Sequence, residues 1–133
     1  MKMGTSEKKL EGWVKELAKL FGYRYYHTWR SLHSPAGFCD CVLVRPPRLI
    51  FAELKSDRGK LTPEQEAWLD VLSRCPGVEV YLWKPDDFQD ISDILMCHTL
   101  EEVPASKTRW PLEAKDEQLE TSARTPPTPG ANE

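Results

Sequence analysis

Two short apolar runs on either side of a proline turn constrain the fold of this chain more than any other feature. Residues 41–44 and 49–55 have the composition of β-strands, and Arg45-Pro46-Pro47-Arg48 between them is a turn sequence. This pattern predicts a hairpin. An acid, Asp40, stands at its start, and twelve residues later come Glu53, Leu54 and Lys55. Since side chains alternate along a strand, Glu53 and Lys55 are predicted to share one face and Leu54 the other.

The spacing of these polar residues, D-x12-E-x-K, is typical of a metal site. An Asp and a Glu can share one divalent cation, and a Lys two places after the Glu can lie beside a water that the cation activates. This is the minimal chemistry for hydrolysing a phosphodiester. The alternative is structural, because E-x-K alone is common on solvent-exposed strands, where it marks a cross-strand ion pair.

Composition predicts one water-soluble domain. The chain has 133 residues, of which 40% are hydrophobic and 29% charged. No apolar run approaches the ~20 residues of a membrane span, and the N-terminus leads into a charged helix, so we expect a cytoplasmic protein with no membrane partner. The four cysteines lack the paired spacing of a zinc site, and Cys39 and Cys41 are expected to be buried thiols.

Charge is distributed unevenly along the chain. The net charge is −3, but residues 111–133 hold five acids and two bases, whereas residues 24–60 hold seven bases and three acids. The segment around the hairpin is therefore predicted to attract a phosphate backbone. Arg30, Arg58, Lys60 and His27 are the candidate DNA contacts, although scattered surface bases and a structural histidine would look the same.

The order of the expected elements predicts an α/β fold with a mixed sheet. An amphipathic helix over 6–21 precedes strand formers at 23–29, the hairpin, a helix from Thr62, a strand over 78–83 and a short helix from 85. Apolar periodicity fades at Pro104. We therefore expect a folded domain over 1–103 and a disordered, acidic, proline-rich tail over 104–133.

Two further polar residues lie on the inward faces of the expected helices. Glu7 is either a first-turn acid that stabilises the helix N-terminus or a third acid beside Asp40 and Glu53. Gln65 completes a capping box with Thr62. It could instead hydrogen-bond the attacking water or the phosphate.

Four stretches of the sequence form a combined pattern: Gly37-Phe38-Cys39-Asp40, Glu53-Leu54-Lys55, Thr62-Pro63-Glu64-Gln65 and Trp83-Lys84-Pro85. This pattern resembles the VRR-NUC domain, a member of the PD-(D/E)xK nuclease superfamily. The similarity covers roughly residues 6–95. Cys39 stands where the family usually has proline, which implies altered local rigidity and unchanged chemistry.

The resemblance implies a restriction-endonuclease-like core, with a mixed central sheet flanked by helices, that hydrolyses DNA with Mg²⁺ or Mn²⁺. Asp40, Glu53 and the Leu54 backbone carbonyl would bind the metal, with Glu7 directly or through water. Lys55 and Gln65 would complete the catalytic set with these acids.

The resemblance also bears on substrate and assembly. Small phage and bacterial members resemble Holliday-junction resolvases, which implies branched or four-way DNA, a homodimer, and the cytoplasm of a bacterium or a phage-infected cell. An aromatic strand region is a plausible partner surface; its residues are Tyr23, Tyr25, Tyr26 and Trp29. Two alternatives remain: a monomeric nuclease for flaps or branched ends, and a non-catalytic DNA-binding or assembly module derived from a nuclease.

Overall fold

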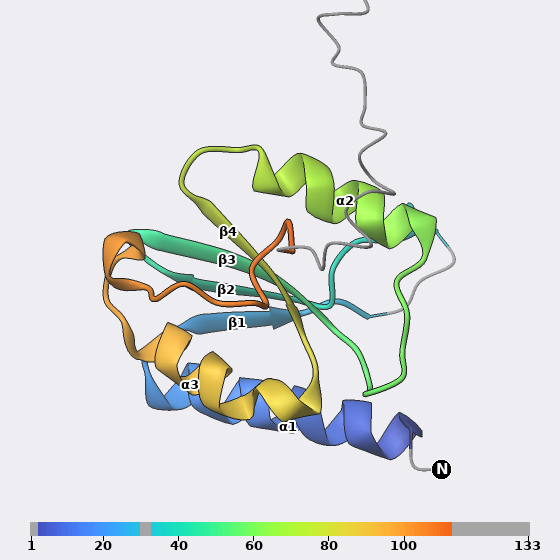
Figure 1. Cartoon of the computed structure of the whole chain (residues 1–133), viewed down its shortest axis with the longest axis horizontal. Coiled ribbons are helices and arrows are strands. Elements are labelled where there is room, and N and C mark those ends of the chain that lie inside the picture. Colours follow the sequence, from blue (N-terminus) through green and yellow to red (C-terminus); the bar gives the residue numbers. More distant parts are fainter. Residues whose placement is uncertain (1–2, 30–32, 113–133) are drawn as a thin grey trace, which may run out of the picture.

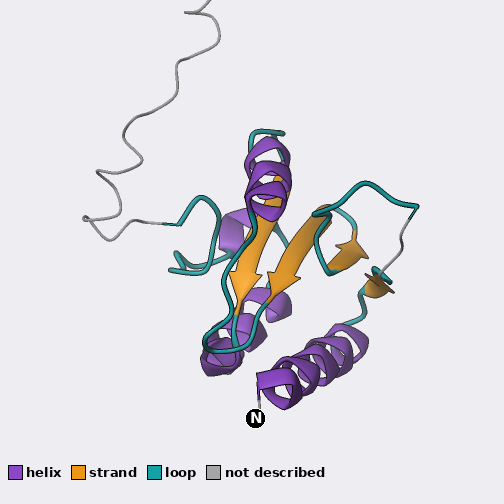
Figure 2. Cartoon of the chain, turned by 90° about the vertical axis from the view of Figure 1, so that its right-hand side faces the viewer, coloured by secondary structure: helices purple, strands orange, loops and turns teal. Residues whose placement is uncertain are grey.

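A four-stranded mixed sheet lies between helices on both faces (Figures 1 and 2). The structure, a computed structural model, describes residues 3–29 and 33–112, with side chains from residue 6. The helices are α1 (Met3–Leu20), α2 (Pro63–Ser73) and α3 (Phe88–Met96), with short 3₁₀ turns η1 (Pro85–Asp87) and η2 (Leu100–Glu102). The strands are β1 (Arg24–His27), β2 (Cys41–Arg45), β3 (Arg48–Leu54) and β4 (Val78–Trp83). No helix in the described residues is long and apolar enough to cross a membrane.

The sheet has the spatial order β1-β2-β3-β4. The first three strands are antiparallel, and β3 and β4 run parallel because α2 carries the chain back to the same end. The predicted α/β class and mixed sheet are confirmed. Pro46 and Pro47 form the turn of the predicted hairpin, since proline cannot supply the N–H that a ladder needs.

Alternation along the strands divides the core into two layers. On one face, Leu43 and Ile50 pack with Leu10 and Val14 of α1 and with Ile94 of α3. On the other face, Leu69 of α2 packs against Val80 of β4 and against Cys39. Figure 2 shows α2 on one side of the sheet and α1 and α3 on the other.

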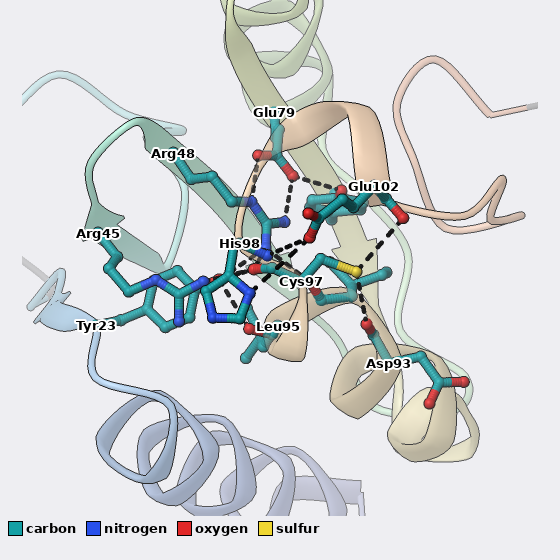
Figure 3. A network of polar contacts seen from close by, with 11 residues as sticks. Tyr23, Arg45, Arg48, Glu79, Asp93, Leu95, Cys97, His98 and Glu102 are labelled. Carbon is teal, nitrogen blue, oxygen red and sulfur yellow. Dashed lines mark hydrogen bonds and ion pairs between the residues drawn. The ribbon is translucent and has the colours of Figure 1, made fainter.

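A buried ion pair lies at the end of the sheet where β3 begins. The guanidinium of Arg48 donates two hydrogen bonds to the Glu79 carboxylate, at 2.8 and 2.6 Å, and both side chains are completely buried (Figure 3). Arg48 also donates to Tyr23 Oη and to the carbonyl oxygens of Ile94 and Cys97, at and just beyond the end of α3. These bonds satisfy carbonyl groups that a helix leaves unpaired at its C-terminus.

Arg45 acts in the same way on α1. Its guanidinium donates to the Phe21 carbonyl at 2.6 Å and lies 4.4 Å from the centre of the Tyr23 ring. Both arginines of the hairpin turn are therefore structural. The predicted electropositive segment loses two of its seven bases, because charge counted along the sequence does not show which side chains are buried.

The folded region extends past the boundary predicted from the sequence. Leu82 N donates to Thr108 O at 3.0 Å and Trp110 N donates to Val80 O at 2.8 Å, so this segment pairs with the free edge of β4. Thr108 is buried. The prediction that disorder begins at 104 is wrong for residues 104–112, since main-chain pairing at a sheet edge needs no apolar periodicity. The remaining residues, 113–133, lie outside the described part.

Candidate active site

Asp40 and Glu53 face each other across the β2–β3 hairpin. The register pairs Cys41 with Ala52, so the next pair outward is Asp40 with Glu53. Asp40 Oδ2 accepts a hydrogen bond of 2.7 Å from the Leu54 backbone N–H, which holds its carboxylate at the end of β3. Like charges directly opposite each other destabilise a sheet. The fold therefore keeps an unfavourable pair at this point.

The Glu53 carboxyl group is almost completely buried, with 1% exposure. Burial raises the pKa of Glu53 to about 9 from its ordinary value of 4.5, and the neighbouring Asp40 and, more weakly, Glu7 add to the rise. Lys55 acts in the opposite direction. Its ammonium nitrogen lies 3.7 Å from Glu53 Oε2. The predicted common face of Glu53 and Lys55 is thus present.

Gln65 forms the predicted capping box and also contacts Glu53, a contact that the sequence did not predict. Its side-chain oxygen accepts a hydrogen bond from Thr62 N at 2.9 Å, and Thr62 Oγ1 accepts one from Gln65 N at 3.1 Å, which is the capping box. At the same time its Nε2 donates to Glu53 Oε2 at 2.9 Å. Because the amide has one acceptor and one donor end, capping and contact with the site are compatible.

The donor set at this point suits a hard divalent cation. In the described residues there is no group of three or more His, Cys, Asp or Glu side chains arranged to hold a metal ion. The Asp40–Glu53 pair remains, and Glu53 Oε1 is buried with no hydrogen-bond partner among the described residues. Mg²⁺ is often bound through one or two carboxylates and keeps several waters. A cation here would also relieve the repulsion between the two carboxylates.

The four candidate DNA contacts have different surroundings. Arg58 and Lys60 are exposed in the loop between β3 and α2, next to Lys55 in the chain. His27 faces α1, where its Nε2 lies 2.6 Å from Glu11 Oε2. Arg30 lies outside the described residues.

Thr28 lies beside Asp40 in the sheet, a position that the sequence did not predict. Its backbone N–H donates to Asp40 O at 2.8 Å, so the β1–β2 ladder continues past His27 and places Thr28 opposite Asp40. The Thr28 hydroxyl is buried and has no hydrogen-bond partner among the described residues. Only the strand register reveals this position, because a threonine after an aromatic run has no distinctive pattern.

Six buried polar atoms lack a partner within the described residues: Ser6 Oγ, Tyr25 Oη, His27 Nδ1, Thr28 Oγ1, Glu53 Oε1 and Trp83 Nε1. Thr28 and Glu53 lie on the face of the sheet that carries the site, whereas Tyr25, His27 and Trp83 face α1 and α3. Thr28 pairs with Asp40, and Trp83 pairs with Leu54. At the opposite end of the sheet, the buried Arg48 and Glu79 side chains are hydrogen-bonded to each other. Since buried polar groups nearly always have partners, the unsatisfied end is where a polar ligand fits.

The protein is thus an α/β protein with a mixed sheet between helices. At one end of the sheet it carries two opposed acids, Asp40 and Glu53, and a lysine, Lys55. A search of solved structures finds the same fold in a structure described as "VRR_NUC domain", with a TM-score of 0.51 and 18% sequence identity over 65% of this chain and 92% of that one. No family model matches the sequence. No curated protein matches it either. The resemblance seen in the sequence is thus confirmed at the level of the fold.

Proposed function

We propose that this protein is a metal-dependent endonuclease that hydrolyses phosphodiester bonds in DNA. The observation that carries the proposal is the pair of opposed carboxylates, Asp40 and Glu53, with a buried and unpartnered Glu53 oxygen. A purely structural E-x-K strand would place its glutamate in water or in a complete ion pair. Here the glutamate is buried against another acid, and Lys55 lies beyond normal hydrogen-bonding distance at 3.7 Å.

In this proposal Asp40, Glu53 and the Leu54 backbone carbonyl would hold Mg²⁺ or Mn²⁺, and Glu7 would help directly or through water. The bound cation would polarise the phosphoryl group and lower the pKa of a water molecule. Lys55 supplies a positive charge and three donors beside the position of the reacting phosphate. Gln65 fixes the orientation of Glu53 through its 2.9 Å hydrogen bond.

Contacts at the first turn of α2 hold the Gln65 side chain in the position from which it reaches Glu53. The capping box fixes the Gln65 side-chain oxygen against the first turn of the helix. Gly37, with φ +95°, allows the preceding loop to approach the same turn, because a Cβ there would come within 2.6 Å of the Glu64 backbone. The loop that leads to Asp40 and the helix that carries Gln65 are thus in direct contact.

For the substrate we propose branched DNA: either a four-way junction that a homodimer cuts with a resolvase-like pair of nicks, or a flap or branched end that a monomer cuts. Symmetric incision needs two active sites about a two-fold axis. The expected partner surface is smaller than predicted, because Tyr23 is buried and Tyr25 is packed against the core, which leaves Tyr26 and Trp29 exposed. This favours the alternative of a monomeric nuclease for flaps or branched ends.

One assay tests the activity and separates the substrates. Purified protein is incubated with labelled four-way, flap and linear DNA of equal length, in Mg²⁺, in Mn²⁺ and in EDTA. Cleavage that requires the metal supports the proposal, and light scattering under the same conditions gives the number of chains. Binding without any cleavage in either metal would point to the non-catalytic DNA-binding module instead.

A further inference from the structure

The end of β4 places a second lysine next to Lys55. Lys55 N donates to Trp83 O at 3.0 Å, so the parallel β3–β4 ladder, which pairs Leu54 with Trp83, continues by one residue. The next pair is Lys55 with Lys84. The Lys84 backbone is extended like that of a strand, with φ −129° and ψ 166°. Neighbouring strands are about 4.8 Å apart, and Figure 1 shows β3 and β4 side by side, so the two lysines are direct neighbours.

Lys84 points to the face of the sheet that carries the candidate site. Trp83 is completely buried in the core on the side of α1 and α3. Because side chains alternate along a strand, Lys84 lies on the opposite face. There it lines a pocket together with Leu82, which the register pairs with Glu53. Lys55 contacts Glu53 on the same face. Beside its two acids, this end of the sheet therefore carries two lysines.

The Lys84 ammonium group forms no ion pair within the described residues. The buried acid of the pocket, Asp87, is bonded to other groups, since it accepts hydrogen bonds from Lys84 N at 2.8 Å and from Lys107 Nζ at 3.3 Å. The other acids that line the pocket, Asp57 and Asp86, are exposed, so solvent screens their charges. Two neighbouring lysines repel each other, and an anion bound beside both would relieve that repulsion.

We propose that Lys84 binds the DNA phosphate next to the scissile one, while Lys55 lies at the scissile phosphate itself. The inference rests on the proposed function and adds a second phosphate-binding residue to the same site. Lys84 is one strand further than Lys55 from Asp40, so its phosphate lies beyond the one at the Asp40–Glu53 pair. The pocket has a volume of about 410 Å³, within the range of about 300–1,000 Å³ for ligand sites. It therefore has room for a segment of the DNA backbone.

Lys84 contributes to binding and not to the chemical step. The phosphate next to the scissile one has the same charge before and during the reaction, so a lysine bound to it stabilises the ground state and the transition state equally. Loss of such a contact raises KM and leaves kcat unchanged. Lys55, in contrast, acts on charge that develops at the scissile phosphate. Kinetics therefore distinguish the two lysines although they are neighbours.

The salt dependence of DNA binding in EDTA tests the contact without depending on cleavage. Fluorescence anisotropy measures the affinity for labelled linear duplex and four-way DNA. Loss of one phosphate contact reduces the slope of log K against log salt by about 0.9. Lys84→Gln should therefore weaken binding by about tenfold at about 50 mM salt and by only about threefold at about 200 mM. Lys84→Arg keeps the charge and should bind as wild type does.

Lys15→Gln is the matched control, because it removes the same charge from an exposed position on α1, across the sheet from the site (Figure 2). Its affinity and salt slope should equal those of wild type. On a substrate that wild type cuts, Lys84→Gln should raise KM by about tenfold with kcat nearly unchanged. Lys55→Ala should lower kcat instead.

Three results overturn the inference. The first is an affinity and salt slope of Lys84→Gln that equal those of Lys15→Gln. The second is a fall in kcat without a rise in KM, which would place Lys84 at the scissile phosphate. The third is a lower melting temperature with unchanged DNA binding, which would make Lys84 a structural ion-pair partner.

The same measurements separate this inference from the proposed function. A wild type that cuts DNA while Lys84→Gln binds normally contradicts the inference alone. A wild type that binds DNA but cuts it in neither metal contradicts the proposed function, and the salt slope of Lys84→Gln still decides whether Lys84 binds phosphate. A wild type that neither binds nor cuts contradicts both.

Discussion

Replacing Glu53 with glutamine should stabilise the metal-free protein at alkaline pH while it removes the activity. The Glu53 carboxyl is 1% exposed and faces the Asp40 carboxylate. Glutamine keeps the volume and still accepts the hydrogen bond from Gln65. It removes the charge that burial makes unfavourable, and its amide can donate to Asp40.

The size of the effect follows from the shift in pKa. Burial first, and the Asp40 carboxylate second, raise the pKa of Glu53 from 4.5 to about 9. Between these values the folded protein binds more protons than the unfolded chain, so stability is full below about pH 4.5 and is lost as the pH rises toward 9. Each pH unit corresponds to about 1.4 kcal/mol. Between pH 5 and pH 8 the loss is therefore about 4 kcal/mol, a large part of the 5–15 kcal/mol that holds a typical domain together.

Urea denaturation in EDTA at pH 5 and pH 8 measures this difference. Wild type should lose about 4 kcal/mol more than Glu53→Gln between the two pH values. Glu16→Gln, which changes an exposed glutamate in the middle of α1, should follow wild type. Adding Mg²⁺ at pH 8 should stabilise wild type and leave Glu53→Gln unchanged. Parallel pH curves for wild type and Glu53→Gln would refute the claim that the carboxyl is buried against a second acid.

Four further changes test other parts of the structure. Lys55→Ala should slow cleavage by about 10²–10³-fold with little change in metal affinity by calorimetry; loss of metal binding would make Lys55 an ion-pair partner only. Gln65→Glu keeps the capping box but sets a carboxylate against Glu53, so helix stability should hold and activity should fall sharply; full activity would remove Gln65 from the site. Arg48→Met should cost about 3–5 kcal/mol in urea denaturation, because it leaves a buried charge unpaired; a cost below 1 kcal/mol would contradict the buried network. Deleting 113–133 should leave the melting temperature unchanged, whereas deleting 104–133 should lower it, since Thr108 and Trp110 then no longer bond β4; equal melting temperatures would show that this pairing adds nothing.

Local patterns predicted the elements well. The Pro46-Pro47 turn, the Thr62 cap and the alternation of Val78–Trp83 each act over a few residues, so the hairpin, α2 and β4 are where the sequence indicates them. Local patterns could not, however, show that the folded region continues past residue 104. Edge pairing of residues 108–110 with β4 depends on main-chain groups, which have no sequence signature.

Within the candidate site, the sequence predicted which residues would gather but not their contacts. The D-x12-E-x-K spacing implies the hairpin register, and the register brings Asp40 opposite Glu53. Neither the double role of Gln65 nor the place of Thr28 follows from spacing, because both depend on how α2 and β1 pack against the hairpin. The burial of Arg48 could not be predicted from the sequence either, since an arginine in a turn sequence is expected to be exposed to solvent.

Mg²⁺-dependent cleavage by wild type and Asp40→Asn is the most direct test of the central claim. The flap and four-way substrates are bound first in EDTA, to show that the variant folds and binds DNA, and the reaction is then started with Mg²⁺. Wild type should cut at least one of these substrates. Asp40→Asn should bind as tightly as wild type or more tightly, because a negative charge facing phosphate is lost, and should cut neither. Cleavage by Asp40→Asn at the wild-type rate would contradict a metal site at the Asp40–Glu53 pair.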